Sequence, residues 1–183
     1  MIEREELYTL TGTVETDEIF IEGKQSVENR KKFDSNKTPF LMMVSESKEG
    51  QPRFVKLEEL EDITQQYVIP AIELGVEPGS LIKSDGAVTY VAVRGKGYEL
   101  NQSSYNQFPE QTVEHLKWLN TLTSNLKRFL ISTHHGVFPK YRRSYLAEFA
   151  YRFNRRYWPH QAFDRLLYAC LHGEPKTLPE LKA

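Results

Sequence analysis

The sequence has 183 residues and a formal net charge of −1, and 39% of its residues are hydrophobic and 12% aromatic. This composition supports a buried core and excludes a disordered chain, and the lack of an apolar run near ~18 residues excludes a membrane-spanning segment. The single cysteine, Cys170, excludes an internal disulfide and a zinc site built on paired cysteines. It fits a reducing cytoplasm, where we expect the protein to act.

The first part of the chain predicts strands. Residues 13–21 are rich in β-branched side chains and predict a strand, whereas the basic stretch 24–37 lacks a sustained apolar period and predicts a loop. The apolar run 40–44 predicts a central strand. Residues 53–57 predict another strand after the turn at 50–52, so these two strands form a hairpin.

A helix and further strand–helix units are predicted next. A polar cap at position 62 or 64 begins the helix, and Pro70 is expected to kink or break it. Residues 80–84 predict a strand, residues 87–93 a short helix and residues 98–101 a weak strand.

The last part of the chain predicts helices after a loop at 103–111. Residues 115–132 predict a long helix, residues 142–157 another, and residues 163–172 a further helical segment. The long helix carries a buried stripe at helical spacing, made of Leu116, Leu119, Leu122, Leu126 and Leu130.

The order of these elements predicts an α/β fold. Three antiparallel strands followed by βα units indicate a mixed five-stranded sheet that helices flank. We expect this fold over residues 1–166, with residues 167–183 as a C-terminal tail.

Charge is unevenly distributed along the chain. Residues 1–114 carry 12 Lys and Arg against 21 Asp and Glu, whereas residues 115–166 carry ten against two. A basic segment of this kind indicates a polyanion as partner, and a solvated basic face is the alternative.

Two aspartates stand where a cation site is expected. Asp17 lies inside the first predicted strand, on the side of its apolar neighbours, and Asp85 follows a later strand. A carboxylate in apolar surroundings is unfavourable unless it is paired or binds a cation, and carboxylates at the ends of neighbouring strands can hold Mg²⁺. Two alternatives stay open, because Asp85 with the glycine after it is a common turn dipeptide, and Asp17 with Glu18 can face solvent on an edge strand.

The long predicted helix offers two further polar groups. Asn120 and Lys127 are seven residues apart, which is about two turns, so both lie on one helix face. A carboxamide oxygen can bind a hard cation, and a lysine can contact a phosphate as a point charge. An ordinary exposed helix face is the alternative.

The blocks around these positions carry a family resemblance. They are residues 14–24, residues 83–86, and a helical block over 115–156 that closes with Glu148-Phe149-Ala150-Tyr151-Arg152-Phe153-Asn154-Arg155-Arg156. In order and spacing they resemble the catalytic domain of ISXO2-like transposases, of the IS1595 group of bacterial insertion sequences. These proteins are DDE-type recombinases with an RNase H-like fold, and the likeness spans about residues 12 to 157.

The resemblance implies metal-dependent cleavage and strand transfer of DNA at insertion-sequence ends. Asp17, Asp85 and Asn120 would bind Mg²⁺ or Mn²⁺, and Lys127 would be the associated catalytic lysine. The partners would be transposon ends, target DNA and further copies of the chain in a homo-oligomer. The implied DNA-contacting side chains are Lys117, Lys127, Arg128, Lys140, Arg142, Arg143, Arg152, Arg155 and Arg156, with Lys24, Arg30, Lys31 and Lys32 as a further loop.

Two other functions remain open. Asn120 stands where the wider superfamily has Glu, which fits a catalytically silent remnant that still binds DNA or oligomerises. A nuclease of the same fold that acts on RNA–DNA hybrids or structured DNA is the other alternative. Longer members of the family resemble two-part proteins with a zinc ribbon and a helix-turn-helix region ahead of the catalytic domain, and this sequence has no paired cysteines for such a ribbon.

Overall fold

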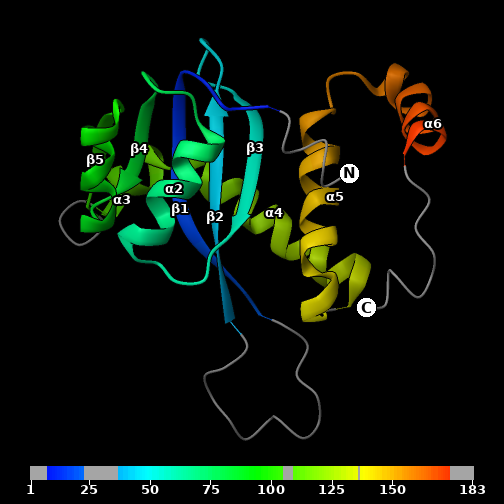
Figure 1. Ribbon diagram of the computed structural model, residues 1–183, viewed down its shortest axis with the longest axis horizontal. Coiled ribbons are helices and arrows are strands. Elements are labelled where there is room, and N and C mark those ends of the chain that lie inside the picture. The colour runs from blue at the N-terminus through cyan, green and yellow to red at the C-terminus, as the bar shows by residue number, and fades with distance from the viewer. Residues whose placement is uncertain (1–7, 23–36, 105–108, 136, 174–183) are drawn as a thin grey trace, which may run out of the picture.

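The computed structural model describes residues 8–22, 37–104, 109–135 and 137–173 (Figure 1). The basic stretch predicted as a loop at 24–37 therefore lies almost entirely outside the described residues. The elements follow in the order β1 (Thr13–Glu22), β2 (Lys37–Glu46), β3 (Pro52–Glu59), α2 (Gln65–Gly75), β4 (Leu81–Asp85), η2 (Val88–Lys96), β5 (Glu99–Ser103), α3 (Pro109–His115), α4 (Lys117–His134), η3 (Pro139–Tyr141), α5 (Arg142–Asn154), η4 (Pro159–Gln161) and α6 (Ala162–His172).

The strands form one mixed sheet in the order β3-β2-β1-β4-β5. β1, β2 and β3 pair antiparallel, whereas β4 runs parallel to both β1 and β5. The predicted fold class, a mixed five-stranded α/β sheet with helices on its faces, is confirmed. β1 is the central strand, and most of its side chains between Val14 and Ile21 are buried or half-buried, whereas Phe20 near its end is exposed.

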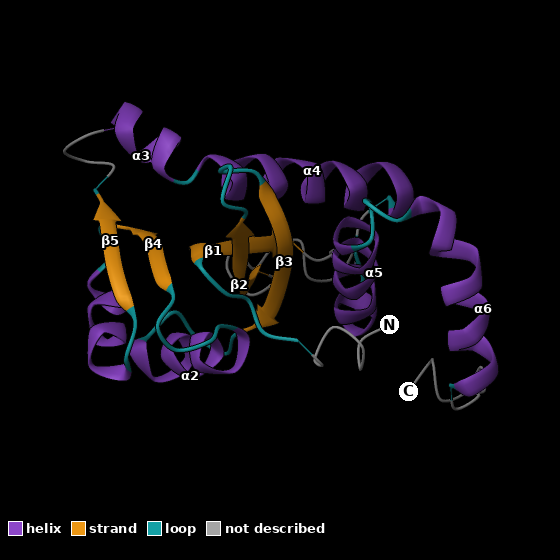
Figure 2. Ribbon diagram, turned by 90° about the horizontal axis from the view of Figure 1, so that it is seen from above, coloured by secondary structure: helices purple, strands orange, loops and turns teal. Residues whose placement is uncertain are grey.

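Helices α4 and α2 cover opposite faces of the sheet (Figure 2). Each face has its own core, because successive side chains of β1 point to opposite faces. Ile19 and Ile21 pack with the leucine stripe of α4 and with α5. Val14 packs on the opposite face with α2 and η2. The five leucines predicted as the buried stripe are all buried. Asp17 has the same parity as Ile19, so it belongs to the α4 side of the sheet.

Several helices differ from the predictions. α5 ends at Asn154, before the predicted end at 157, and α3 begins at Pro109, inside the predicted loop 103–111. α2 continues through Pro70 without a break, because Pro70 is exposed while Val68 and Ile72 on either side of it are buried against the sheet. The long helix begins at Lys117 and not at His115, since Leu116 leaves helical geometry and separates α3 from α4. The helical segment predicted at 163–172 forms as α6, and the expected division of the chain at 166–167 stays a prediction.

α6 lies beyond α5, away from the sheet (Figures 1 and 2). Its large apolar side chains, Phe163, Leu166, Leu167 and Leu171, are exposed. None of the helices in the described ranges is both long and apolar enough to cross a membrane.

The Asn154 side chain connects helix α5 to the edge strand β3 by hydrogen bonds. An edge strand presents backbone N–H and C=O groups that no neighbouring strand pairs. The Asn154 side chain accepts the N–H of Val55 in β3 at 2.8 Å and donates to its C=O at 2.9 Å. The side chain also donates to the Tyr8 hydroxyl. The C-terminal block of the family resemblance therefore contributes to the fold itself.

We expect Asn154→Ala to lower the free energy of unfolding by about 2–4 kcal/mol, because it leaves buried backbone groups of Val55 unpaired. Urea unfolding measured at one pH tests this value. Asn125→Ala, at an exposed position of α4, is the matched control and should change stability by no more than about 0.5 kcal/mol. Equal effects of the two substitutions would contradict the role given to Asn154.

Candidate active site

The pairing of β1 with β4 brings Asp17 and Asp85 together. The two strands are parallel, and Glu15 is the partner of Lys83 in their register. Continued by two residues, this register would bring Asp17 level with Asp85, the last residue of β4, and the charge of Asp85 does act on Asp17. Opposite residues in a parallel pair face the same side of the sheet, so both belong to the α4 side. The carboxyl end of a strand in an open α/β sheet is where ligands generally bind.

The electrostatics of Asp17 show that the two carboxylates interact. Burial, and after it the negative charge of Asp85, raise the pKa of Asp17 from 3.8 to about 7. The hydrogen bond from the Glu18 backbone N–H to Asp17 Oδ1, at 2.8 Å, opposes this rise without cancelling it. Two carboxylates that repel one another in a half-buried place form a donor set that a divalent cation would stabilise.

Both alternatives for the aspartates can now be assessed. The solvent-facing edge pair is wrong for Asp17, because β1 is the central strand. The turn at Asp85 is present, since Asp85 Oδ1 accepts the N–H of Ala87 at 2.9 Å. The same side chain nevertheless interacts with Asp17, so a turn and a place in the carboxylate pair are compatible.

Glu18 and Tyr90 lie beside this pair and were not predicted as part of the site. Burial, and then a smaller contribution from the charge of Asp85, raise the pKa of Glu18. Tyr90, from η2, is fully buried, and burial together with the charges of Glu18, Asp17 and Asp85 raises the pKa of its phenol well above its ordinary value. Among the described residues no partner completes a hydrogen bond of standard geometry with its hydroxyl. The sequence pattern did not predict that Tyr90 lies near the aspartates. Its position depends on how η2 packs in the folded protein.

Asn120 and Lys127 lie on α4, which packs against the same face of the sheet. The first turn of α4 is bonded to β1, because Glu15 Oε2 accepts the N–H of Leu119 at 2.6 Å. Asn120 is the next residue and is exposed, as is Lys127 two turns further on. The structure thus brings Asp17 and Asp85 together and places the helix start that carries Asn120 two residues from Asp17 along β1. The convergence of the Asn120 amide on the aspartates stays a prediction.

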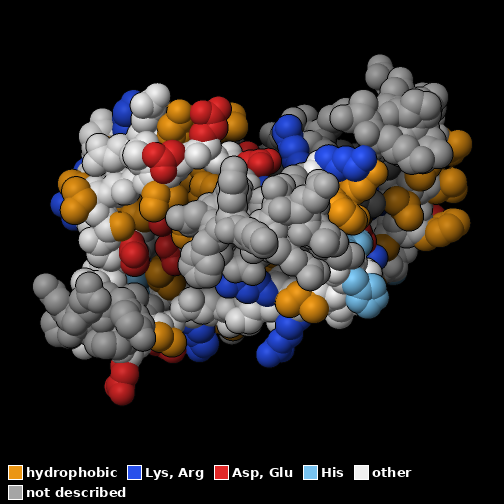
Figure 3. All heavy atoms as spheres, turned by 90° about the horizontal axis from the view of Figure 1, so that it is seen from below, with side chains coloured by type: hydrophobic (Ala, Val, Ile, Leu, Met, Phe, Trp, Pro, Cys, Tyr) orange, Lys and Arg blue, Asp and Glu red, His pale blue; other side chains and the backbone are white. Residues whose placement is uncertain are grey.

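Exposed basic side chains extend from α4 toward α5. Lys117, Lys127 and Arg128 on α4 are exposed, and so are Lys140 and Arg143 further along the chain. Lys117 lies 3.4 Å from Glu114 in an exposed ion pair, which contributes little to stability. Seen from below, Lys and Arg side chains occupy the middle of the face, beside acidic side chains toward β4 and β5 (Figure 3).

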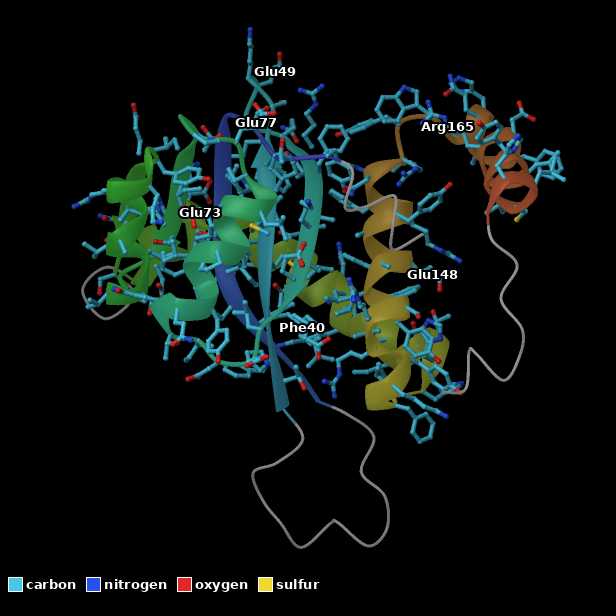
Figure 4. The ribbon with its side chains drawn as sticks, in the orientation of Figure 1. Phe40, Glu49, Glu73, Glu77, Glu148 and Arg165 are labelled. Carbon is cyan, nitrogen blue, oxygen red and sulfur yellow. The ribbon has the colours of Figure 1, made fainter. Side chains whose placement is uncertain are left out.

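Four arginines predicted to contact DNA interact within the fold. Arg142 is buried and donates to Thr38, and burial removes it from the proposed DNA surface. Glu148 lies on the side of α5 that faces away from the sheet (Figure 4), and Arg152 forms an ion pair with it at 2.8 Å. The remaining two use aromatic rings and backbone carbonyls: Arg155 lies over Tyr151, and Arg156 lies over Phe153 and donates to Pro52 and Arg53.

The match to a known family covers the sheet, both cores and the carboxylate pair. The family model described as the ISXO2-like transposase domain matches residues 9–154, from before β1 to the end of α5. The chain belongs to the ISXO2-like transposase domain family. This confirms the predicted family and, with the mixed sheet, the RNase H-like fold. No curated protein matches the chain.

DDE transposases such as those of the ISXO2-like family generally use divalent metal ions. In the described ranges no group of three or more His, Cys, Asp or Glu side chains is arranged to hold a metal. The predicted set has two carboxylates, Asp17 and Asp85, and an amide, and its oxygen donors suit Mg²⁺ or Mn²⁺. The raised pKa of Asp17 supports this fit, because a cation would offset the repulsion between the carboxylates.

Proposed function

We propose that this ISXO2-like transposase domain is the catalytic core that cleaves DNA at the ends of an insertion sequence and joins them to a target. The observation that carries the proposal is the carboxylate pair of Asp17 and Asp85 on neighbouring parallel strands, with α4 bonded beside it. The family match supports DNA as the substrate.

In this proposal Asp17, Asp85 and the Asn120 amide hold Mg²⁺ or Mn²⁺. Bound divalent cations supply activation of the attacking water or 3′-hydroxyl and stabilisation of the leaving oxygen of a phosphodiester. The protein residues position the groups: the β1–β4 register aligns the two carboxylates, and Lys127 binds a backbone phosphate as a point charge. The reaction needs no nucleophilic side chain from the protein.

The DNA path follows the exposed basic side chains of α4 and the segment after it. Lys117, Lys127, Arg128, Lys140 and Arg143 would neutralise phosphates, which fixes the position of the duplex without reading its sequence. Arg152 pairs with Glu148 and Arg155 lies over Tyr151, so we expect each of them to contribute less to DNA binding. We further propose that the protein acts in the cytoplasm as a homo-oligomer that holds two DNA ends.

The experiment is a cleavage and strand-transfer assay with Mg²⁺ or Mn²⁺ on DNA that carries the insertion-sequence ends. We expect nicks at the ends and joined products that require the metal and disappear in EDTA. An RNA–DNA hybrid of the same sequence serves as control substrate. Binding without cleavage would support the silent remnant, and cutting of the RNA strand alone would support the hybrid nuclease.

A further inference from the structure

We propose that Glu15 is a positioning residue of the active site, which caps the first turn of α4 from β1 and thereby holds Asn120 beside Asp17 and Asp85. The inference rests on the proposed function, because it assigns a role to a residue that lies next to the proposed metal ligands. Glu15 itself would not touch the substrate or the metal.

The start of α4 needs such a cap. The first N–H groups of a helix have no partner within the helix, and a side chain at the N-cap normally accepts them. The N-cap of α4 is Leu116, whose apolar side chain makes no hydrogen bond of this kind. Glu15 supplies it instead, since its carboxylate accepts the N–H of Leu119 at 2.6 Å and interacts with the N–H of Trp118. These are the positions that an N-cap side chain serves.

The residue that follows this cap along the chain is a proposed metal ligand. Asn120 follows Leu119 directly, and its own N–H makes the first helical bond, to the Leu116 carbonyl at 3.0 Å. Glu15 lies two residues before Asp17 on the same face of β1, so one strand carries both the ligand and the cap. Only 1% of Glu15 is exposed, so the carboxylate is enclosed where the helix meets the sheet.

A polar network joins the same three elements one layer below the proposed ligands. Glu15 interacts with Glu46 at the end of β2, and Glu46 Oε1 accepts from Lys83 Nζ at 2.7 Å. Lys83 lies two residues before Asp85, as Glu15 lies two before Asp17. Each element that carries a proposed ligand, β1, β4 or α4, is therefore linked to the other two through Glu15 or its partners. Polar groups that are linked in this way at a poorly exposed place help to fix geometry.

The test compares Glu15→Ala with Glu15→Gln. The glutamine is isosteric, and its amide oxygen can still accept the α4 N–H groups while its NH₂ donates to Glu46. We expect Glu15→Ala to weaken Mn²⁺ binding about 10–100-fold, as loss of residues that orient metal ligands usually does. It should also lower kcat for cleavage with little change in KM for DNA. Amide exchange at Trp118 and Leu119 should become faster than at the rest of the protein. Glu15→Gln should restore most of each quantity.

Val68→Ala is the matched control, since Val68 is fully buried on the opposite face of the sheet. It should lower stability while leaving Mn²⁺ affinity and the exchange of the α4 start unchanged. If Glu15→Ala behaves like Val68→Ala in these measurements, the positioning role is wrong, even with an active wild-type enzyme. If the wild-type protein binds Mn²⁺ without cleaving DNA and the Glu15 effects still appear, the role stands and the proposed function fails.

Discussion

Asp17→Asn should abolish metal-dependent DNA cleavage and make the metal-free protein more stable. The loss of a ligand removes several kcal/mol of charge stabilisation, so we expect the cleavage rate to fall by ~10³-fold or more. The stability gain follows from the raised pKa of Asp17, because the neutral amide removes a repelled, half-buried carboxylate. At pH 8 without metal we expect a gain on the order of 2 kcal/mol, a reduced figure that allows for partial exposure.

The measurements are single-turnover cleavage and thermal unfolding in EDTA. Asp62→Asn is the matched control, because Asp62 is an exposed aspartate whose carboxylate accepts the N–H of the next residue, Ile63. It should leave both quantities near the wild-type values. A destabilised Asp17→Asn protein would show that the carboxylate pair is held by favourable interactions and is not a site prepared for a cation.

Without metal, the protein should lose stability as the pH rises from about 4 to about 7. The folded-state pKa values of Asp17 and Glu15 are raised to about 7 from ordinary values of 3.8 and 4.5, and the pKa of Glu18 is also raised. Over that interval the folded protein holds protons that the unfolded chain has released, so the free energy of unfolding falls with rising pH. The contribution of these groups to the free energy of unfolding is fully present below about pH 4. It is lost as the pH rises through their folded-state pKa values.

Mg²⁺ should reverse this loss at pH 8 and have little effect at pH 5, where Asp17 is protonated. At 100 times its dissociation constant a ligand adds about 2.7 kcal/mol, or roughly 5–10 °C in melting temperature for a chain of this size. Melting curves with Mg²⁺ and with NaCl at equal ionic strength measure the effect. Asp17→Asn and Asp85→Asn should each remove the Mg²⁺ shift, and a shift that persists in both would place the ion elsewhere.

The first three strands could be predicted from local sequence, because each has a short-range pattern typical of a strand or of the turn before it. The β-branched run of β1, the apolar run of β2 and the turn before β3 are short-range features, and all three elements form as predicted. The predicted break of α2 at Pro70 is wrong. The unfavourable helix propensity of proline is outweighed by the burial of the apolar residues around it. The break at Leu116 had no local signal, since the cap that starts α4 comes from Glu15, 104 residues away.

The number of arginines did not predict which of them are exposed. Their number predicted a polyanion surface, but charge along the chain does not show which side chains reach solvent. Arg142 is buried, and Arg156 bonds the backbone of β3. Asn154, in the same block, pairs with β3 in a way that only the packing of α5 on the edge strand reveals.

The sequence alone determined the family, the order of the strands and helices, and two aspartates as candidate ligands, because those depend on residue type, spacing and short-range propensity. The tertiary structure alone decided that the two aspartates interact, that Glu18 and Tyr90 lie near them, and that Glu15 accepts a hydrogen bond from the first turn of the neighbouring helix. Strand register and helix packing bring together residues that are far apart along the chain, and no local pattern encodes those contacts.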